Sequence, residues 1–358
     1  MTSAWTRAQV AAIDGGLAGT VPKFEPRRRP VGGEGRYYWD MWPIQHADGT
    51  VAKLGTREWW MALSATDRGD PGRRHFEAEI RWIERQGDAW RDRGAVLPPH
   101  AAPYEREWAG SALLDRGRLT LFFTGAGTSE RPGGYQQRLF EASAPVSADG
   151  TIGQWDRPCP SITALTDDYC AADAHDGEPG RIKAFRDPAF FRDPATGEDY
   201  LVFTASLAAT QSAYNGAVGL ARREGEGWAL LPPLVHADGV NNELERAHVV
   251  AHGGFYYLFW VTQRATFSPD LTPGPTGLYG MVATSLAGPW TPLNHGGLVL
   301  TNPATDPGLT YSWFVTREGI VSSFVDDVAG HGFGGCPAPL LQLTFDGETV
   351  RLAGTAAA

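Results

Sequence analysis

The 358-residue sequence predicts an all-β fold, on three observations. Apolar residues at helical spacing are nearly absent beyond the first 16 residues, whereas short runs of strand-forming residues recur along the whole chain. The 44 glycines and several Asp-Gly pairs are typical of tight turns between strands. The 13 tryptophans add flat apolar faces of the kind that carbohydrate sites often use.

The elements can be assigned in chain order. Thr6-Arg7-Ala8-Gln9 resembles a capping box and predicts a short helix from about residue 6 to Ile13, before Gly15-Gly16. The strand-like runs that follow are Trp59 to Ser64, Leu119 to Thr124, Tyr200 to Ala205, Phe255 to Thr262, Leu278 to Ala283, Gly319 to Val325 and Leu340 to Phe345. Tight hairpins are predicted at Asp48-Gly49, Asp149-Gly150 and Asp346-Gly347.

A weak internal repeat sets the domain organisation. A glycine stands shortly before a tryptophan at Trp90, Trp155, Trp228 and Trp290, and these tryptophans are 62 to 73 residues apart. A unit of that size holds four strands with their loops, which is the size of a propeller blade. We therefore expect residues 1–358 to form a single catalytic domain, a five-bladed β-propeller with a central axial active-site pocket.

Counting from each repeat tryptophan places the innermost strand of the next blade. By this count Asp40, Trp108, Asp187, Glu245 and Tyr311 lie one per blade around the central channel. The extra length before Asp187 is matched by the polar stretch from Leu165 to Gly180, which we interpret as a surface loop insertion.

Charge and composition exclude several classes of partner. The net charge is -10, and no basic cluster offsets it, so nucleic acid and anionic membrane surfaces are not expected as partners. No apolar run approaches the ~20 residues of a membrane span, and Met1 to Val10 lack the features of a secretory signal. Cys159, Cys170 and Cys336 have no metal-ligand spacing and can form one disulfide at most.

Three acids stand beside aromatic or basic residues in strand-like segments. Asp40 lies within the aromatic run from Tyr37 to Ile44, Asp187 follows Arg186, and Glu245 is two residues from Glu243. Retaining glycoside chemistry needs a carboxylate nucleophile and a carboxylic acid about 5 to 5.5 Å apart. Asp40 suits the nucleophile, and an ionised Asp187 beside Arg186 suits binding of sugar hydroxyls. Glu245, crowded by Glu243, suits the acid/base because like charges disfavour ionising both.

Each of these residues also has a structural interpretation. Asp40 can be a hydrogen-bonded structural carboxylate, and Trp39 and Trp108 can be core aromatics. Asp187-Pro188 can be a turn, and its near copy Asp193-Pro194 is expected to be one. Glu243 or Glu245 can merely pair with Arg246 or Arg264. The occurrence of the set, one per blade, favours an active site.

The motifs together resemble those of glycoside hydrolase family 68, the levansucrase type. They occur in family order from residue 5 to about residue 345. The matching segments are Trp5-Thr6-Arg7-Ala8, Trp39-Asp40-Met41-Trp42-Pro43, Glu107-Trp108-Ala109-Gly110-Ser111, Phe185-Arg186-Asp187-Pro188, Glu243-Leu244-Glu245-Arg246, Tyr257-Leu258-Phe259-Trp260, Tyr311-Ser312-Trp313 and Phe333-Gly334-Gly335. The related family 32 shares the Phe-Arg-Asp-Pro element but not the other acid motifs, and is the weaker match.

The resemblance implies a five-bladed propeller that uses sucrose as fructosyl donor. It implies that Asp40 is the nucleophile, Asp187 the transition-state stabiliser and Glu245 the acid/base. It further implies a fructosyl subsite lined by Trp39, Trp108 and Arg186, and a glucosyl or acceptor side formed by Glu243, Arg246, Arg264 and Tyr311.

Three departures from the family pattern bear on these roles. Ala109 stands where some members have a serine that hydrogen-bonds the nucleophile, and Ser111 is not an obvious replacement. Asn242 stands where calcium-binding members carry an acid, so we expect no metal and no cofactor. The acceptor-side residue lies in a loop of variable length, which leaves Gln263 as the alternative to Arg264.

The sequence is compatible with three functions. The first is a fructosyltransferase that transfers fructose from sucrose to sucrose or to a growing fructan. The second is a β-fructofuranosidase that mainly hydrolyses sucrose, and the third is a non-catalytic sugar-binding propeller. We expect a monomer whose partners are sucrose and fructan acceptors. The resemblance implies an extracellular enzyme, whereas the missing signal allows a mature chain, non-classical export or a cytoplasmic location.

Overall fold

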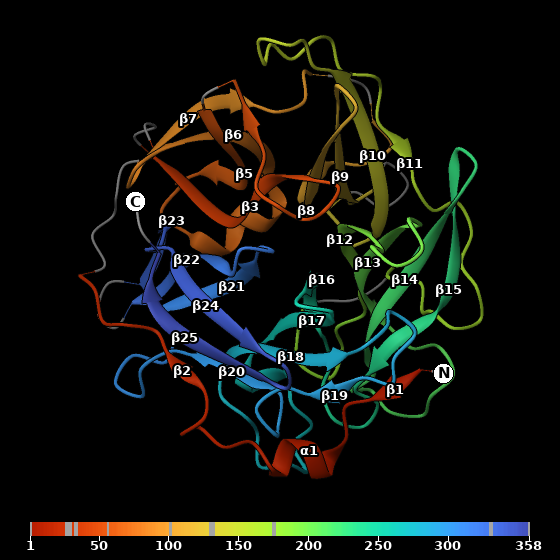
Figure 1. The fold of residues 1–358 in the computed structure, drawn as a ribbon, viewed down its shortest axis with the longest axis vertical. Helices are drawn as coiled ribbons and strands as arrows, with labels where there is room; N and C mark the ends of the chain where they lie inside the picture. The colour runs from red at the N-terminus through yellow and green to blue at the C-terminus, as the bar shows by residue number, and fades with distance from the viewer. Residues whose placement is uncertain are drawn as a thin grey trace.

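The fold is all-β, as predicted, with strands gathered in four hydrogen-bonded sheets (Figure 1). The computed structural model describes residues 2–25, 31, 35–55, 57–99, 102–128, 133–173, 177–328 and 332–356. Within these ranges the helices are α1 (Arg7–Ala11) and the two short 3-10 helices η1 (Pro71–Phe76) and η2 (Arg264–Thr266). None of the helices in the described part of the chain is long and apolar enough to span a membrane.

The largest sheet has nine strands in the order β11-β10-β9-β8-β3-β5-β6-β7, with β4 beside β5. Its strands are β3 (Arg36–His46), β4 (Lys53–Leu54), β5 (Arg57–Thr66), β6 (Glu79–Gln86), β7 (Ala89–Ala95), β8 (Arg106–Asp115), β9 (Arg118–Ala126), β10 (Gln137–Pro145) and β11 (Cys159–Pro160). Its two halves are antiparallel hairpins joined only by the parallel pairing of β3 with β8, from Ile44–Ala112 to His46–Leu114.

The other three sheets follow in chain order. One consists of β12 (Phe185–Arg192), β13 (Asp199–Ser206), β14 (Gly216–Glu224) and β15 (Gly227–His236), with β1 (Ser3–Ala4) at its edge. The next consists of β16 (Glu245–His252), β17 (Phe255–Thr262), β18 (Gly277–Ala283), β19 (Thr291–Pro292) and β20 (Leu298–Thr301), with β2 (Gly19–Thr20) at its edge. The last consists of β21 (Thr310–Val315), β22 (Ile320–Val328), β23 (Gly332–Pro337), β24 (Leu341–Asp346) and β25 (Thr349–Thr355).

Five strands lie innermost around a common axis. Figure 1 shows β3, β8, β12, β16 and β21 nearest the centre, and each of them contacts the next, with β21 returning to β3. These are the strands that the repeat count predicts to begin each unit, since they carry Asp40, Trp108, Asp187, Glu245 and Tyr311. Residues far apart in sequence therefore meet on one axis.

The amino-terminal segment ties two sheets together. β1 pairs in parallel with β15, and β2 pairs in parallel with β20. Between them Trp5 is 1% exposed; its ring packs against Trp260 and Tyr279, and its indole N–H donates to the carbonyl of Gly296 at 3.1 Å. The apolar side chain and its satisfied indole N–H fix this segment against the sheets.

The predicted helix is present but shorter than expected. The capping box is complete, because the Thr6 hydroxyl accepts from the Gln9 N–H and the Gln9 side chain accepts from the Thr6 N–H. The helix ends at Ala11 rather than Ile13, where the N–H of Ala12 bonds back to the carbonyls of Ala8 and Gln9. Each of the seven predicted strand-like runs lies in an observed strand, although β22 and β24 each begin one residue later.

The stretch from Leu165 to Gly180 is a loop with mostly exposed residues, as expected. Residues 174–176 lie outside the described part, and among the rest Tyr169 and Ala172 are buried. Tyr169 is 3% exposed, and its hydroxyl donates to Leu231 and accepts from the N–H of Leu220. This anchor carries the following residues toward the central axis.

All three cysteines are free.

Candidate active site

A one-residue bulge interrupts each of the five innermost strands near its start. The pairing with the second strand shifts between Trp39 and Trp42, Trp108 and Gly110, Arg186 and Ala189, Glu245 and His248, and Tyr311 and Phe314. A bulge re-aims the side chains on either side of it, which is why bulges recur at active sites.

Four of the bulges hold a non-glycine residue with positive φ. The values are 49° for Asp40, 58° for Asp187, 51° for Arg246 and 57° for Ser312. Such conformations are uncommon for residues with a Cβ atom and persist where the surrounding structure enforces them. The repetition at equivalent positions of four strands marks this level of the axis as the functional one.

The bulges surround a pocket of about 360 Å³. Seven of the ten predicted site residues line it: Trp39, Asp40, Trp108, Arg186, Asp187, Glu243 and Glu245. Arg246 and Tyr311 contact this lining through Asp40 and Glu245. Only Arg264 among the predicted set has no such contact.

Glu245 is held by two donors from different sheets. The Tyr311 hydroxyl donates to its Oε2 at 2.5 Å, and Nη2 of Arg186 lies 3.3 Å from its Oε1. The two contacts together orient the carboxylate.

Arg186 joins three carboxylates. It forms a hydrogen-bonded ion pair with Glu243, lies 3.3 Å from Glu245, and places Nε 3.3 Å from Oδ2 of Asp187. Burial alone would lower the pKa of Arg186, but these carboxylates raise it above its ordinary value. Burial raises the pKa of both Asp187 and Glu243 to about 7, although the Arg186 charge opposes the rise.

Asp40 faces a cation and a hydroxyl. Nη1 of Arg246 lies 3.9 Å from its Oδ1, and the Ser312 hydroxyl is hydrogen-bonded to the carboxylate. Burial raises the pKa of Asp40, and Arg246 and the hydroxyl oppose that rise. Because Arg246 Nη1 also donates to Ser312 Oγ at 3.1 Å, the proton of Ser312 is directed at Asp40.

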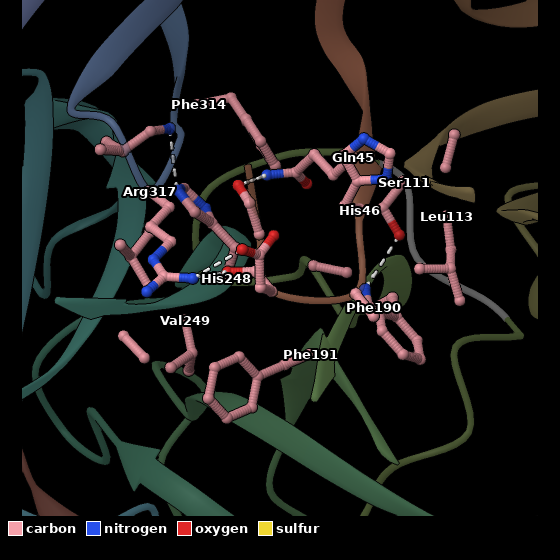
Figure 2. A pocket seen from close by; sticks show the side chains of 18 residues that line it. Gln45, His46, Ser111, Leu113, Phe190, Phe191, His248, Val249, Phe314 and Arg317 are labelled. Atoms are coloured by element: carbon pink, nitrogen blue, oxygen red, sulfur yellow. Dashed lines mark hydrogen bonds and ion pairs between the residues drawn. The ribbon is translucent and has the colours of Figure 1, made fainter. Parts of the chain in front are cut away.

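Ser312 supplies the hydroxyl that Ala109 lacks. Ala109 has no hydroxyl to offer, and Ser111 instead accepts from the N–H of Phe190 at 2.9 Å, farther along the axis (Figure 2). The hydroxyl beside Asp40 therefore comes from β21. The sequence contains the signal, the Tyr311-Ser312 pair, but nothing in it shows which strand faces Asp40.

The acceptor-side expectation for Arg264 is not supported by its position. Its side chain is exposed and donates to the carbonyl of Pro273 at 3.1 Å. Gln263 lines the pocket and hydrogen-bonds to Tyr311. Because η2 begins directly after Gln263, the chain turns there and directs Arg264 outward.

Sequence reasoning missed the contribution of η1. His75 lines the pocket, and its carbonyl accepts from the indole N–H of Trp108 at 3.0 Å. Burial lowers the pKa of His75 to about 3, so its imidazole is neutral. The Arg74 guanidinium packs over the Phe333 ring, 4.0 Å from the centroid. The polar segment around η1 has no periodicity that would have identified it.

A second, narrow cavity lies farther along the same innermost strands. Figure 2 shows Gln45, Ser111, Phe190, His248 and Phe314 around it, and its volume is about 20 Å³. Nε2 of His248 accepts from the N–H of Val315 at 2.9 Å, which leaves Nδ1 to donate to the carbonyl of Arg246. Burial lowers the pKa of His248 to about 3. This histidine is a neutral structural group.

The surroundings of Asn242 do not fit a metal ion. Its amide donates to the carbonyls of Ile182 and Ala213, and its Oδ1 accepts from the N–H of Gly180. The Lys183 ammonium also donates to Ala213 O, at 3.0 Å, and to Asn215 Oδ1, at 2.7 Å. A cation would compete with an ammonium for these oxygens. Across the described ranges no group of three or more His, Cys, Asp or Glu side chains is placed to hold a metal.

Similarity to known proteins extends over nearly the whole chain. The family described as levansucrase/invertase, glycoside hydrolase family 68, matches residues 1–221 and 208–354. A levansucrase of Erwinia amylovora is 31% identical over 411 residues, covering 96% of this chain and 92% of that protein.

Solved structures show the same fold. An inulosucrase from Halalkalicoccus jeotgali bound to kestose is 36% identical, with a TM-score of 0.88 over 99% of this chain and 96% of that one. The catalytic domain of a β-fructofuranosidase from Microbacterium saccharophilum has a TM-score of 0.84 over 100% of this chain and 93% of that one. It is 24% identical and is similar in fold alone.

Proposed function

The chain belongs to glycoside hydrolase family 68, and from this premise we propose that it is a retaining fructosyltransferase that takes its fructosyl group from sucrose. The observation that carries the proposal is the convergence of Asp40, Asp187 and Glu245 from three different sheets on one pocket. Retaining transfer needs a nucleophile and an acid/base across one anomeric carbon.

In the proposed mechanism the Asp40 carboxylate attacks the anomeric carbon of the fructosyl unit. Glu245 gives its proton to the glycosidic oxygen, the bond between that oxygen and the anomeric carbon breaks, and glucose leaves. Glu245, now a carboxylate, then takes the proton of an acceptor hydroxyl, whose oxygen displaces Asp40 from the anomeric carbon.

The other pocket residues have supporting roles in this mechanism. Arg246 and Ser312 oppose protonation of Asp40, so they favour the nucleophilic carboxylate. Asp187 is suited to accept hydrogen bonds from fructosyl hydroxyls and to stabilise positive charge at the anomeric carbon. Trp39 and Trp108 supply apolar faces beside it, and Arg186 keeps three carboxylates close without their mutual repulsion dominating.

We also propose that the architecture is one five-bladed β-propeller. The nine-stranded sheet divides at its three-residue parallel junction into a five-stranded unit, β3 to β7, and a four-stranded unit, β8 to β11, which with the other three sheets makes five units. The ring of contacts among β3, β8, β12, β16 and β21, and the bulge that each carries, support the same count.

Incubation with sucrose tests the function. Glucose in excess over fructose, together with kestoses or polymer, is the result expected of a transferase. Equal glucose and fructose would indicate the hydrolytic alternative, a β-fructofuranosidase. No glucose release from the parent protein would leave only a sugar-binding role. Asp40→Ala and Glu245→Ala serve as the negative controls.

A further inference from the structure

Two buried threonines flank Asp187 on the second strands of their sheets. Thr124 pairs with Trp108 and Thr204 pairs with Arg186, in each case opposite the residue that precedes the bulge. Both are 0% exposed. The residues at the same pairing position in the other three sheets are apolar: Leu63, Val261 and Phe324. At this pairing position, therefore, hydroxyl side chains occur only on β9 and β13, the two strands whose threonines contact Asp187.

The two hydroxyls make different contacts with Asp187. Thr124 Oγ1 accepts from the backbone N–H of Asp187 at 2.8 Å and donates to the carbonyl of Ala109. Thr204 Oγ1 lies 3.0 Å from Oδ2 of the Asp187 carboxylate and accepts from the backbone N–H of Arg246 at 2.9 Å. Since a backbone N–H can only donate, the single proton of Thr204 is left for Asp187 Oδ2.

The Thr204 hydroxyl donates to a carboxylate that has several charged side chains around it. Asp187 is 6% exposed. Two cations, Arg186 and Arg246, face it, and so do the carboxyl groups of Glu245, Asp40 and Glu243. A hydrogen bond from a neutral hydroxyl stabilises the ionised carboxylate without adding another charge to this cluster.

Thr204 is also connected to Asp40 indirectly, through Arg246. The backbone of Arg246, which Thr204 binds, carries the guanidinium that lies 3.9 Å from Asp40. One hydroxyl therefore links the strand of Asp187 to the strand of Arg246 beneath the pocket. A change of this link would displace both carboxylates relative to each other.

We propose that Thr204 is a positioning residue of the transfer reaction, whose hydroxyl holds the Asp187 carboxylate in place and couples it to the backbone of Arg246. The inference rests on the proposed function, because it assigns Asp187 a role in turnover. It concerns a residue that never touches the substrate.

The test compares Thr204→Val, which has nearly the same shape but no hydroxyl, with Thr204→Ser, which keeps the hydroxyl. Thr204→Val should lower kcat for glucose release about tenfold with a smaller change in KM, because an interaction that matters in the transition state is weakened. The acidic limb of its kcat/KM profile should move up by about one pH unit, since the ionised Asp187 loses a donor. Thr204→Ser should restore both values.

Thr124→Val is the matched control. Its hydroxyl contacts only main-chain groups, so the variant should lose thermal stability without moving the acidic limb. An unshifted limb in Thr204→Val, or an equal shift in both valine variants, would overturn the proposal and assign Thr204 a purely structural role. If Thr204→Val does not fold, Thr204→Ala is compared with Thr204→Ser in the same way. Glucose release by the parent tests the proposed function separately from these differences.

Discussion

The Tyr311 hydroxyl donates a hydrogen bond of 2.5 Å to Oε2 of Glu245. Burial raises the pKa of Tyr311 well above its ordinary value, so the phenol keeps its proton and remains a donor throughout the working pH range. Tyrosine thus orients the proposed acid/base from a strand that lies across the pocket from the strand of Asp187.

Tyr311→Phe should therefore lower kcat/KM for sucrose by about tenfold, in the range of a lost hydrogen bond to a charged group. Glucose release at subsaturating sucrose measures it. Tyr200→Phe is the matched control, because the Tyr200 hydroxyl donates to Glu198 away from the pocket. A Tyr311→Phe enzyme as fast as the control would show that this contact does not orient Glu245.

The two Arg-Asp-Pro segments should respond in opposite ways to removal of their aspartates. Asp187→Ala should abolish most turnover, by about 10³-fold, with the fold intact. Asp193→Ala should keep turnover but lose about 1 to 3 kcal/mol of stability. The reason is that buried Asp193 accepts from Ala195 N–H, Thr196 Oγ1 and the Tyr256 hydroxyl. Glucose release and thermal unfolding separate the two effects.

The stability of Asp187→Ala relative to the parent should depend on pH. The pKa of Asp187 in the fold is about 7, raised by burial, whereas an unfolded aspartate titrates near 4. Between these values the folded parent holds the extra proton, so its stability falls as pH rises. The Tm of Asp187→Ala minus that of the parent should increase from pH 4 to about pH 7 and then level off. A difference that is flat with pH would contradict the raised pKa.

We expect that a hydroxyl placed on β8 can partly replace the Ser312 hydroxyl beside Asp40. Ser312→Ala should lower kcat about tenfold by removing the donor to the carboxylate. Adding Ala109→Ser, which returns a hydroxyl from β8, should recover part of the loss. If kcat of the double variant exceeds kcat of Ser312→Ala, a hydroxyl on β8 can replace the one on β21 as donor to Asp40. A double variant no faster than the single one would mean that β8 cannot reach Asp40.

Gln263 and Arg264 should differ in their effect on products. Water at about 55 M competes with the acceptor sugar for the fructosyl intermediate, so transfer needs a rim that orients the sugar. Gln263→Ala should raise the ratio of free fructose to oligosaccharide, whereas Arg264→Ala should leave it unchanged. Product analysis at equal sucrose measures both. The reverse outcome would restore the placement inferred from sequence alone.

Activity and Tm should be insensitive to chelation. The oxygens of Ala213 and Asn215 already accept from the Lys183 ammonium. EDTA should change neither rate nor Tm, and Lys183→Met should lower Tm because both oxygens lose a donor. A marked loss of the parent's Tm in EDTA, reversed by calcium, would refute this interpretation of the Asn242 site.

The elements that could be predicted were those with a local signal. The capping box of Thr6 and the strand runs depend on neighbours in sequence, and the repeat tryptophans locate the strands that carry the acids. What could not be predicted depends on turns and on packing between strands. The chain turns into η2 directly after Gln263, so Gln263 rather than Arg264 faces the pocket. Ser312 lies in the bulge of β21 beside Asp40, whereas Ser111 lies beyond the bulge of β8 and binds Phe190. The contribution of η1 depends on tertiary packing that no periodicity reveals.

The pairing of the amino-terminal segment has a consequence for synthesis. Ser3 pairs with Val235, Trp5 binds the carbonyl of Gly296, and Gly19 pairs with Leu300. These residues are made before their partners and therefore wait on the order of tens of seconds for them. During translation Trp5 has no hydrophobic pocket to enter, and two sheets lack an edge strand. Completion of the fold is thus deferred until most of the chain exists, and a nascent chain stalled before residue 300 would present these unpaired strand edges to chaperones.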